Sequence, residues 1–410
     1  MLAKKKSVAL IDVRQDALKG FCLYTPKGVR KRTLYSIAVH GKKTGLWKKT
    51  TSPHAPNKKK KLNRTTYSSE RTRVWYFQLK GTTFFLSAVY VQSTSNRDRF
   101  MDYLAVQFVC RTLSCAQFPP YMGSMLRGGL GTQLRRAVCL VKNKECQDCM
   151  LAGSCIFPKL FIAGKAPDQF FYAPQLPPPY CLEPPKLAEL ELPSGTQFTF
   201  GLKLFSYAVQ YLPYFIYAIS LAGQKGLGRG SNQGFGKYTI EDVRQNGVSV
   251  YDAAKDRLFG ARTETLEKPM LGCDTTPKTV TVDLMTPLRC KQSNHLAKDL
   301  PFDLLLRLII RRLRGLYALD GHTLRLPPEE FDTLSKTAQG IETKENSLTW
   351  RDWHRYSGRQ NTGMQLGGLV GTIRYHGPTA AFSEYLDFAS RVHLGKQTSF
   401  GLGLITVSPA

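Results

Sequence analysis

The residues best suited to chemistry lie in a glycine-rich segment near the end of the chain, residues 393–403. The segment begins with His393, contains Lys396 and precedes a short apolar run. Glycine lets a backbone turn sharply and lets a second backbone approach closely, and the amide groups of such a turn can bind an anion. Lysine adds a point charge, and histidine can exchange a proton near neutral pH. The segment therefore predicts an anion-binding loop that carries an acid–base residue.

A second segment of this kind spans residues 223–240, where glycines are interspersed with Lys225, Arg229 and Lys237 and a strand-like run follows. The glycines precede a strand instead of opening a helix after one, so the dinucleotide-binding fingerprint fits poorly, and the Gly-Lys-Ser/Thr of a Walker loop is lacking. Two such loops indicate two similar halves that each hold a phosphate backbone. The alternative is a pair of flexible hairpin turns.

Four cysteines within seventeen residues form a third chemical feature: Cys139, Cys146, Cys149 and Cys155. Their C-x6-C-x2-C-x5-C spacing suits a tetrahedral metal ion held by thiolates. Zinc is the first expectation and an iron–sulfur cluster the second, because both accept an all-cysteine ligand set. No histidine lies nearby, which favours a structural metal. The alternative is four unrelated reduced thiols.

Two predicted helices would position basic side chains. Leucines recur every four residues over 126–134, which is helical spacing, and the exposed side of that helix would carry Arg127, Arg135 and Arg136. The segment 301–319 is the clearest long helix, with three arginines that share one face: Arg307, Arg311 and Arg314. Guanidinium groups can make bidentate phosphate contacts. This face either tracks phosphates or is a solvated basic face of a core helix.

The charge of the chain is large and uneven. The 410 residues carry a net charge of +28, which favours a polyanionic partner. Residues 1–100 contain 23 Lys and Arg but only 4 Asp and Glu. This part is either a basic arm that binds RNA or DNA non-specifically or a segment outside the functional unit, translated from a start codon assigned too far upstream. No apolar run is long enough to span a bilayer, and a cytoplasmic location with free thiols is expected.

Several loose motifs follow one another in a recognisable order over residues 101–410. They are the segment 125–131, the four cysteines, the segments 177–185, 286–289, 355–360 and 366–371, and the terminal loop 395–403. In this order the chain resembles the CRISPR precursor-RNA-processing endoribonucleases of the repeat-associated mysterious protein superfamily, in the branch with a cysteine cluster. The first hundred residues have no counterpart in that pattern.

The resemblance implies an α+β fold with tandem ferredoxin-like (βαββαβ) domains. The first would span residues 101–245, with the cysteine knuckle at 139–155, and the second residues 246–410; residues 1–100 would be a basic extension. The resemblance also implies binding of CRISPR precursor RNA, with other effector subunits as further partners and no membrane. The expected RNA-binding residues are Arg127, Arg135, Arg136, Lys225, Arg229, Lys237, Arg307, Arg311, Arg314, Arg355, Gly395 and Gly401.

The implied reaction is an attack of the ribose 2′-OH on the adjacent phosphate, which needs no metal and leaves a 2′,3′-cyclic phosphate and a 5′-OH. It requires a base and an acid, and cations that stabilise the phosphorane. The expected base is His393, with Lys396 and Arg359 on the phosphate and Tyr356 as an orienting or donating group; His354 and His295 are weaker candidates.

The first predicted helix carries Thr132 where many relatives have a histidine. The alternative function is therefore a non-catalytic RNA-binding subunit of a CRISPR effector complex. A third hypothesis is a DNA-binding zinc protein that acts through its lysine-rich arm.

Overall fold

The computed structural model of the protein describes most of the chain after residue 98 and a short stretch before it. The described residues are 67–69, 72–79, 82–88, 99–142, 144–162, 164, 175–185, 187, 190–292, 295–324, 326–357 and 362–409, with the backbone alone for 67–100, 354–357 and 362–365. The chain divides into two compact units, Met1–Arg97 and Asp98–Ala410. In the first unit the described strands form one antiparallel sheet, β1 (Tyr67–Ser69), β2 (Thr72–Leu79) and β3 (Thr82–Ala88). The lysine runs of the predicted arm lie outside the described residues.

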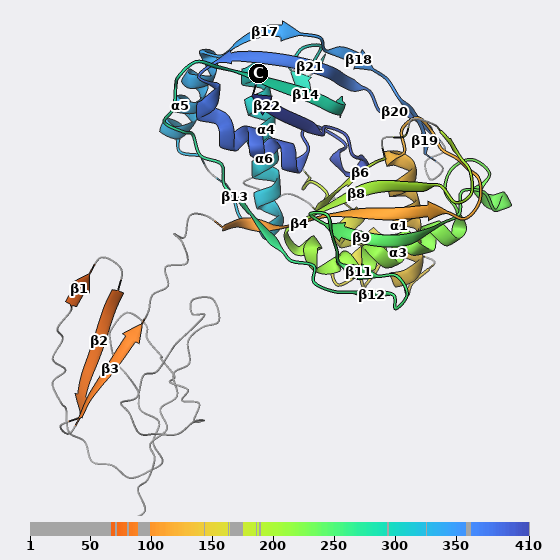
Figure 1. Cartoon of the computed structure of the whole chain (residues 1–410), viewed down its shortest axis with the longest axis horizontal. Helices are drawn as coiled ribbons and strands as arrows, with labels where there is room; N and C mark the ends of the chain where they lie inside the picture. The colour runs from red at the N-terminus through yellow and green to blue at the C-terminus, as the bar shows by residue number, and fades with distance from the viewer. Residues whose placement is uncertain are drawn as a thin grey trace, which may run out of the picture. The chain divides into compact units, whose positions relative to one another are not determined.

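The first half of the second unit is built as strand, helix, two strands, helix and strand (Figure 1). These elements are β4 (Arg99–Thr112), α1 (Gly123–Val138), β6 (Tyr180–Glu183), β8 (Gln197–Phe205), α3 (Leu212–Lys225) and β9 (Tyr238–Gln245). The strands lie side by side in the order β9-β4-β8-β6, and each pairs antiparallel with its neighbours.

This first sheet extends beyond the predicted domain boundary at residue 245. Strand β10 (Val248–Ser249) pairs with β9, and β13 (Glu264–Glu267) pairs with β4. The change to the second sheet therefore lies after Glu267, because the segment 246–267 completes the edge of the first one.

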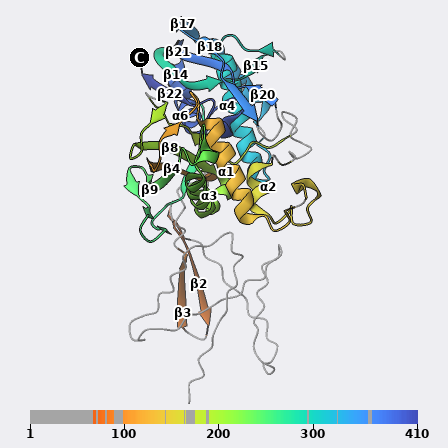
Figure 2. The same cartoon turned by 90° about the vertical axis from the view of Figure 1, so that its right-hand side faces the viewer.

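Alternation along the central strands explains where the first core lies. Every second side chain of β8 from Phe198 to Leu204 is buried, as expected for a strand with one face on a core. Helices α1 and α3 lie side by side against this sheet (Figure 2). Glycines in α1 allow close contacts: a Cβ at Gly129 would lie 2.6 Å from the Leu227 side chain, and one at Gly131 would lie 2.8 Å from the Phe161 ring.

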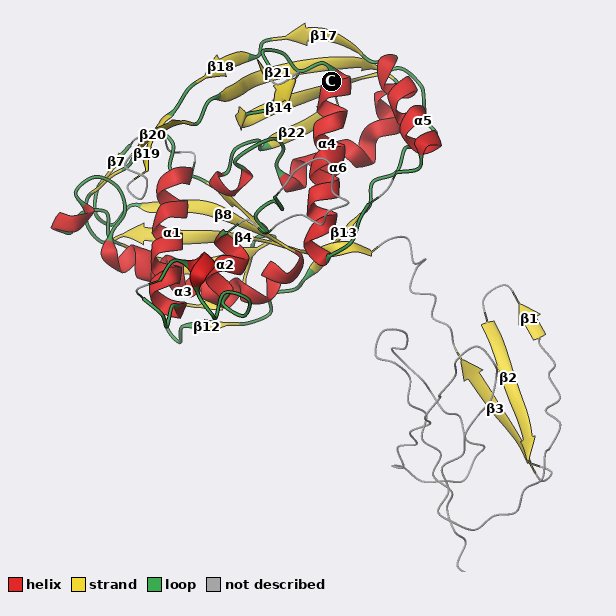
Figure 3. Ribbon diagram, turned by 180° about the vertical axis from the view of Figure 1, so that it is seen from behind, coloured by secondary structure: helices red, strands yellow, loops and turns green. Residues whose placement is uncertain are grey.

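The second half repeats the same order of elements. It consists of β14 (Lys278–Leu288), α4 (Phe302–Tyr317), β17 (Glu342–Asn346) with β18 (Thr349–Arg351), β21 (Gly368–Gly377), α6 (Ser383–Val392) and β22 (Ile405–Pro409). The sheet order is β17-β21-β14-β22, and β18 also pairs with β21. Helices α4 and α6 pack against this sheet (Figure 3), and α5 (Pro328–Gln339) packs on α4.

Short elements complete the second unit. They are β5 (Ala116–Gln117), α2 (Ile156–Phe161), β7 (Glu191–Leu192), β11 (Tyr251–Asp252), β12 (Arg257–Leu258), β15 (Lys291–Gln292), β16 (His295–Leu296), β19 (His354–Ser357), β20 (Thr362–Gln365) and the 3₁₀ turns η1 (Cys146–Asp148), η2 (Ser206–Tyr211), η3 (Ser231–Gln233), η4 (Ala318–Asp320), η5 (Thr379–Phe382) and η6 (Thr398–Phe400).

The sequence predictions of a mixed helix-and-sheet fold and of two helices are confirmed. Helix α1 covers the predicted leucine repeat, and α4 begins and ends within two residues of the predicted 301–319. Among the described residues, no helix combines the length and the apolar character that a membrane span needs.

Candidate nucleic-acid interface

The two glycine-rich loops have the same backbone conformation. Loop 1 (residues 226–236) lies between α3 and β9, and loop 2 (residues 393–403) lies between α6 and β22. The amide of Leu227 donates to the Gly236 carbonyl at 2.9 Å, and that of Leu394 donates to the Gly403 carbonyl at 2.8 Å. Each loop contains a 3₁₀ turn, η3 or η6, flanked by residues in the left-handed region. The prediction of two similar loops in two similar halves is thus confirmed.

The surroundings of the two loops differ. In loop 2, Thr398, Ser399 and Phe400 are buried, because the loop packs on the first half of the unit. The Tyr121 hydroxyl donates to the Phe400 carbonyl at 2.6 Å, and Arg127 Nε donates to Ser399 Oγ at 3.2 Å. Loop 1 is also held by neighbouring residues, since the Arg229 amide donates to the Gln117 carbonyl at 3.0 Å and the Ser114 hydroxyl to the Gly234 carbonyl at 3.0 Å. Its turn is nevertheless less covered, and Asn232 and Gln233 are exposed.

His393 occupies a backbone position that glycine fills in loop 1. Its φ and ψ are 57° and 144°, and those of the equivalent Gly226 are 85° and 150°. This lies close to a region that is essentially confined to glycine. The imidazole is fully buried, with Nε2 3.2 Å from Glu183 Oε1 and Nδ1 3.1 Å from the Leu402 carbonyl oxygen. The ring therefore faces protein on both sides, and the prediction that His393 is the catalytic base stays a prediction.

A partly buried ion pair completes the surroundings of His393. Lys203 Nζ lies 2.7 Å from the same Glu183 Oε1. Burial alone would raise the pKa of the Glu183 carboxyl, but the hydrogen bond from His393 and the Lys203 ammonium lower that pKa to about 2. Burial also lowers the pKa of His393, although the hydrogen bond with Glu183 opposes this shift. Through this network β6 and β8 hold the start of loop 2.

Four cations gather where loop 2 meets β14, β15 and α4. Lys396 is exposed, and its pKa is lowered by partial burial and by the positive charges of Lys291, Arg311 and Arg289. The Lys396 amide donates to the Arg289 carbonyl at 2.9 Å. None of these four residues, here termed the cation cluster, forms an ion pair with a described carboxylate. Such a cluster favours the binding of an anion.

Glycine and aromatic neighbours shape this cluster. Gly395 has a φ of +78°, and a Cβ there would lie 2.6 Å from the Arg289 carbonyl oxygen, so the close approach requires glycine. The Arg289 guanidinium donates to the Gly367 carbonyl at 2.9 Å and lies 5.9 Å from the centre of the exposed Trp350 ring. Sequence reasoning assigned no role to Arg289 or Lys291, although Arg289 ends the 286–289 motif.

The arginines predicted on α4 have different environments. Arg311 belongs to the cation cluster, whereas Arg307 pairs with Asp303 one turn earlier, with 2.6 Å between Nη2 and Oδ2. Arg314 is half-buried. The α4 face is therefore partly neutralised, and Arg311 is the member that the structure brings to Lys396.

The basic residues of α1 take part mainly in contacts with protein. The Arg127 guanidinium lies 4.6 Å from the centre of the Phe400 ring, and Arg135 donates to the Lys144 carbonyl at 3.3 Å. Arg136 is exposed. Gly401 passes close to the Leu182 carbonyl and has a φ of +89°, so its glycine serves the packing of loop 2.

Four of the predicted residues fall where the structure describes no side chain. Arg355, Tyr356 and the weaker candidate His354 lie in β19, where the structure describes the backbone, and Arg359 lies outside the described residues. His295 is exposed on β16, opposite Gln292; because side chains alternate along a strand, it lies on the other face of the hairpin from Lys291.

The four cysteines line one cavity of about 300 Å³ together with side chains of the turn after α1. The Cys149 amide donates to the Cys146 carbonyl at 3.4 Å and the Cys155 amide to the Leu151 carbonyl at 2.9 Å, which gives two tight turns. As they stand, no three Cys, His, Asp or Glu side chains of the described residues are arranged to hold a metal ion.

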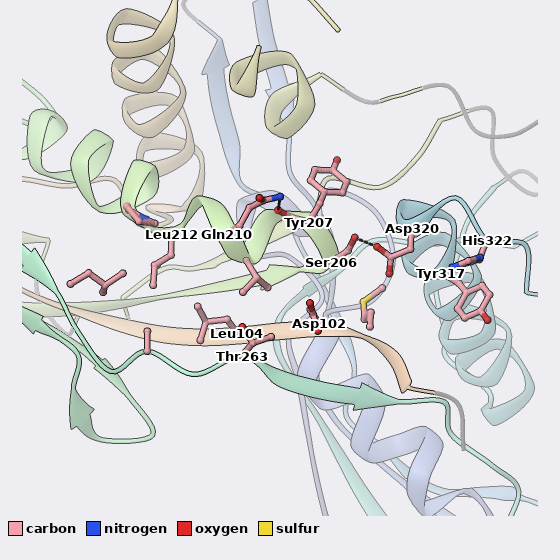
Figure 4. A pocket seen from close by; sticks show the side chains of 15 residues that line it. Asp102, Leu104, Ser206, Tyr207, Gln210, Leu212, Thr263, Tyr317, Asp320 and His322 are labelled. Carbon is pink, nitrogen blue, oxygen red and sulfur yellow. Dashed lines mark hydrogen bonds between the residues drawn. The ribbon is translucent and has the colours of Figure 1, made fainter. Parts of the chain in front are cut away.

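A larger cavity of about 850 Å³ lies where β4, η2 and the end of α4 meet (Figure 4). Ser206, with a φ of 56°, donates a hydrogen bond from its hydroxyl to Asp320 across this cavity wall. Tyr207, Tyr317 and His322 also line it. None of the residues predicted from the sequence contributes to this cavity.

Comparison with known proteins identifies relatives of both halves. Residues 282–405 match the family model of the CRISPR-associated endoribonuclease Cas6, and residues 101–264 match a family model described as an N-terminal domain. An uncharacterized protein of Archaeoglobus fulgidus is 26% identical over 298 residues, which cover 70% of this chain and 92% of the relative.

Solved structures were found as well. A chain of a partial Cas6-RT-Cas1–Cas2 complex has a TM-score of 0.45 and 14% identity; the match covers 76% of this chain and 46% of that one, so this chain spans less than half of its length. The Thermus thermophilus Cas6 has a TM-score of 0.42 and 12% identity, with 75% and 99% covered. Residues 282–405 are therefore similar to the CRISPR-associated endoribonuclease Cas6 family.

Proposed function

We propose that this protein binds the repeat of a CRISPR precursor RNA and cuts it through attack of a ribose 2′-oxygen on the adjacent phosphorus. A bond forms between O2′ and phosphorus, and the bond from phosphorus to O5′ breaks. The 2′-proton passes to a base, and O5′ receives a proton. The products are a 2′,3′-cyclic phosphate and a 5′-OH, and the reaction needs no metal.

The observation that carries this proposal is the cation cluster on loop 2. Charge builds up on the phosphate oxygens in the transition state, and fixed positive groups stabilise it. Lys396, Arg289, Lys291 and Arg311 offer such charges without carboxylate partners among the described residues. We assign Lys396 and Arg311 to the scissile phosphate.

The order of strands supports the tandem ferredoxin-like architecture that this function implies. Numbered along the chain, the four main strands of the first sheet stand in the order 4-1-3-2, and those of the second in the order 2-3-1-4. In each half, one helix follows the first strand and another follows the third. Both sheets thus agree with a βαββαβ unit, which places a glycine-rich loop before the last strand of each.

The proton-transfer groups have an alternative assignment because His393 is buried. His295 is exposed on the β15–β16 hairpin, so we take it as an alternative to the buried His393 as the acid–base candidate, with Tyr356 as a second group. The buried position of His393 and the presence of Thr132 on α1 favour the second candidate function, a non-catalytic subunit that binds the repeat.

The deciding experiment is incubation of the protein with repeat RNA from the same locus in EDTA, with analysis of the product ends. We expect one cut per repeat with the cyclic phosphate on the 5′ product, and complete loss of cutting when the 2′-OH at the cleaved position is replaced by hydrogen. Cutting of the deoxy substrate would refute the mechanism. Tight repeat binding with no product would instead support the non-catalytic subunit.

We also propose that the cysteine cluster binds a structural metal, with zinc preferred over an iron–sulfur cluster. The donor set fits because Cys139, Cys146, Cys149 and Cys155 line one cavity and thiolates are the ligands that structural zinc sites use. The metal would draw the four sulfur atoms together and fix the turns that follow α1.

The metal content of the purified protein tests this assignment. One equivalent of zinc is expected by elemental analysis, and the double variant Cys146→Ser/Cys149→Ser should lose it and melt at a lower temperature. Replacing Cys273, an exposed cysteine outside the cavity, should change neither value. Zinc that persists in the double variant would refute the site.

A further inference from the structure

The outer face of α3 carries exposed aromatic rings. Tyr214 and Tyr217 are 42% and 52% exposed, whereas Phe215, Ile216 and Ile219 are buried in the core. Residues 214, 217, 221 and 225 recur at intervals of three or four, so they form one stripe along the helix. Lys225 stands exposed at the end of that stripe. The stripe therefore leads from two tyrosines to the start of loop 1.

Loop 1 continues the same mixture of side chains. Phe235 is 47% exposed, and Arg229 and Lys237 are exposed beside it. In loop 2 the equivalent turn is buried against α1 and β6, which makes the exposure of loop 1 a real difference between the halves. In Figures 1 and 3, α3 lies at the edge of the second unit opposite β14 and β21.

The segment that carries α3 and loop 1 has charges of one sign. The segment 206–240 contains Lys225, Arg229 and Lys237 but no Asp or Glu. None of the three cations forms an ion pair with a described carboxylate. Exposed rings next to cations without carboxylate partners are the combination that binds single-stranded nucleic acid, with bases on the rings and phosphates near the charges.

The dimensions fit a short single strand. Tyr214 and Lys225 are eleven residues apart on the helix, which corresponds to about 16 Å of helix length. At roughly 3.4 Å per stacked nucleotide this length accommodates on the order of five nucleotides.

We propose that the outer face of α3 and loop 1 bind the single-stranded RNA that flanks the repeat. The inference rests on the proposed function, because the transcript supplies this strand. Tyr214, Tyr217 and Phe235 would stack on bases, and Lys225, Arg229 and Lys237 would contact phosphates. The cation cluster on loop 2 would hold the cleaved linkage, so the two loops would serve different segments of one RNA.

Two RNAs and matched variants test this surface: the repeat alone, and the repeat with single-stranded flanks. The wild type should bind the flanked RNA more tightly. The variant Tyr214→Ala/Tyr217→Ala should lose roughly tenfold or more of the affinity for the flanked RNA and keep its affinity for the repeat alone. Tyr214→Phe/Tyr217→Phe should resemble the wild type, and so should Phe259→Ala, which removes an equally exposed ring outside the surface (47%).

Charge removal gives a separate readout. The slope of the logarithm of the binding constant for flanked RNA against the logarithm of the salt concentration should become shallower by about two in the variant Lys225→Gln/Arg229→Gln/Lys237→Gln. The double tyrosine variant should leave that slope unchanged. The inference would be overturned if the wild type bound both RNAs with equal affinity, or if the variants lost the same factor in affinity for both RNAs. Affinity unaffected by either set of variants would also overturn it and assign the surface to a protein partner.

Failure of the proposed α3–loop 1 surface can be distinguished from failure of the proposed RNA cleavage. If the protein never cuts RNA, the advantage of the flanked RNA and its loss in the variants can still be measured by binding alone. If only the present inference fails, the repeat is still bound and cut at the wild-type rate at saturating RNA.

Discussion

Replacing Lys396 with alanine should lower the single-turnover rate of repeat cleavage about 100-fold at saturating RNA. Three neighbouring cations remain to hold the RNA, so the affinity for the repeat should fall much less than the rate. The physical reason is that the Lys396 ammonium meets charge that grows only in the transition state. The rate is measured with enzyme in excess, and the affinity is measured on an uncleavable 2′-deoxy substrate.

Two arginines on one helix provide the matched control for this prediction. Arg311→Ala should weaken repeat binding and reduce the salt slope by about one, because its charge has no described partner. Arg307→Ala should do little, since Arg307 already pairs with Asp303 at 2.6 Å. Equal effects of the two variants would show that the whole α4 face binds phosphates and that the cation cluster is not a distinct site. If His295 transfers a proton, His295→Ala should in addition lower the cleavage rate roughly 10²- to 10⁴-fold while the repeat is still bound.

Features that depend on local patterns were predictable from the sequence. Helix α4 shows a strong helical repeat because one of its faces is buried along the whole length. The start of the helix could be predicted from Pro301, which lies just before it. The two loops were recognisable because both need glycine at positions with positive φ, such as Gly228 and Gly395.

Features that depend on distant segments were not predictable. His393 and Glu183 are 210 residues apart in the chain, so nothing in the sequence around the histidine reveals that its ring is buried. The cation cluster combines loop 2 with a strand end, a hairpin and a helix, and its members have no common spacing. Burial of loop 2 likewise depends on Tyr121 and Arg127 from the other half.

The second large effect concerns His393, where glycine and alanine should give different results. Alanine keeps the unfavourable φ of 57° and removes both hydrogen bonds of the imidazole, so His393→Ala should lower the free energy of unfolding by about 3 kcal/mol. Glycine loses the same bonds but adopts the backbone conformation freely, as Gly226 does in loop 1. His393→Gly should therefore be more stable than His393→Ala by about 1 kcal/mol. Denaturant titration measures both differences.

The same pair of variants separates a positioning role from a catalytic one. If His393 only holds loop 2 on Glu183, the folded His393→Gly variant should cleave RNA faster than the folded His393→Ala variant, because the glycine variant is the more stable one. The pH–rate profile of both variants should keep the shape of the wild type. A histidine that transfers the proton would lose roughly 10²- to 10⁴-fold in both variants alike, whatever their stability. Because both substitutions remove the imidazole and differ mainly in backbone strain, a rate that follows the strain identifies His393 as a positioning residue.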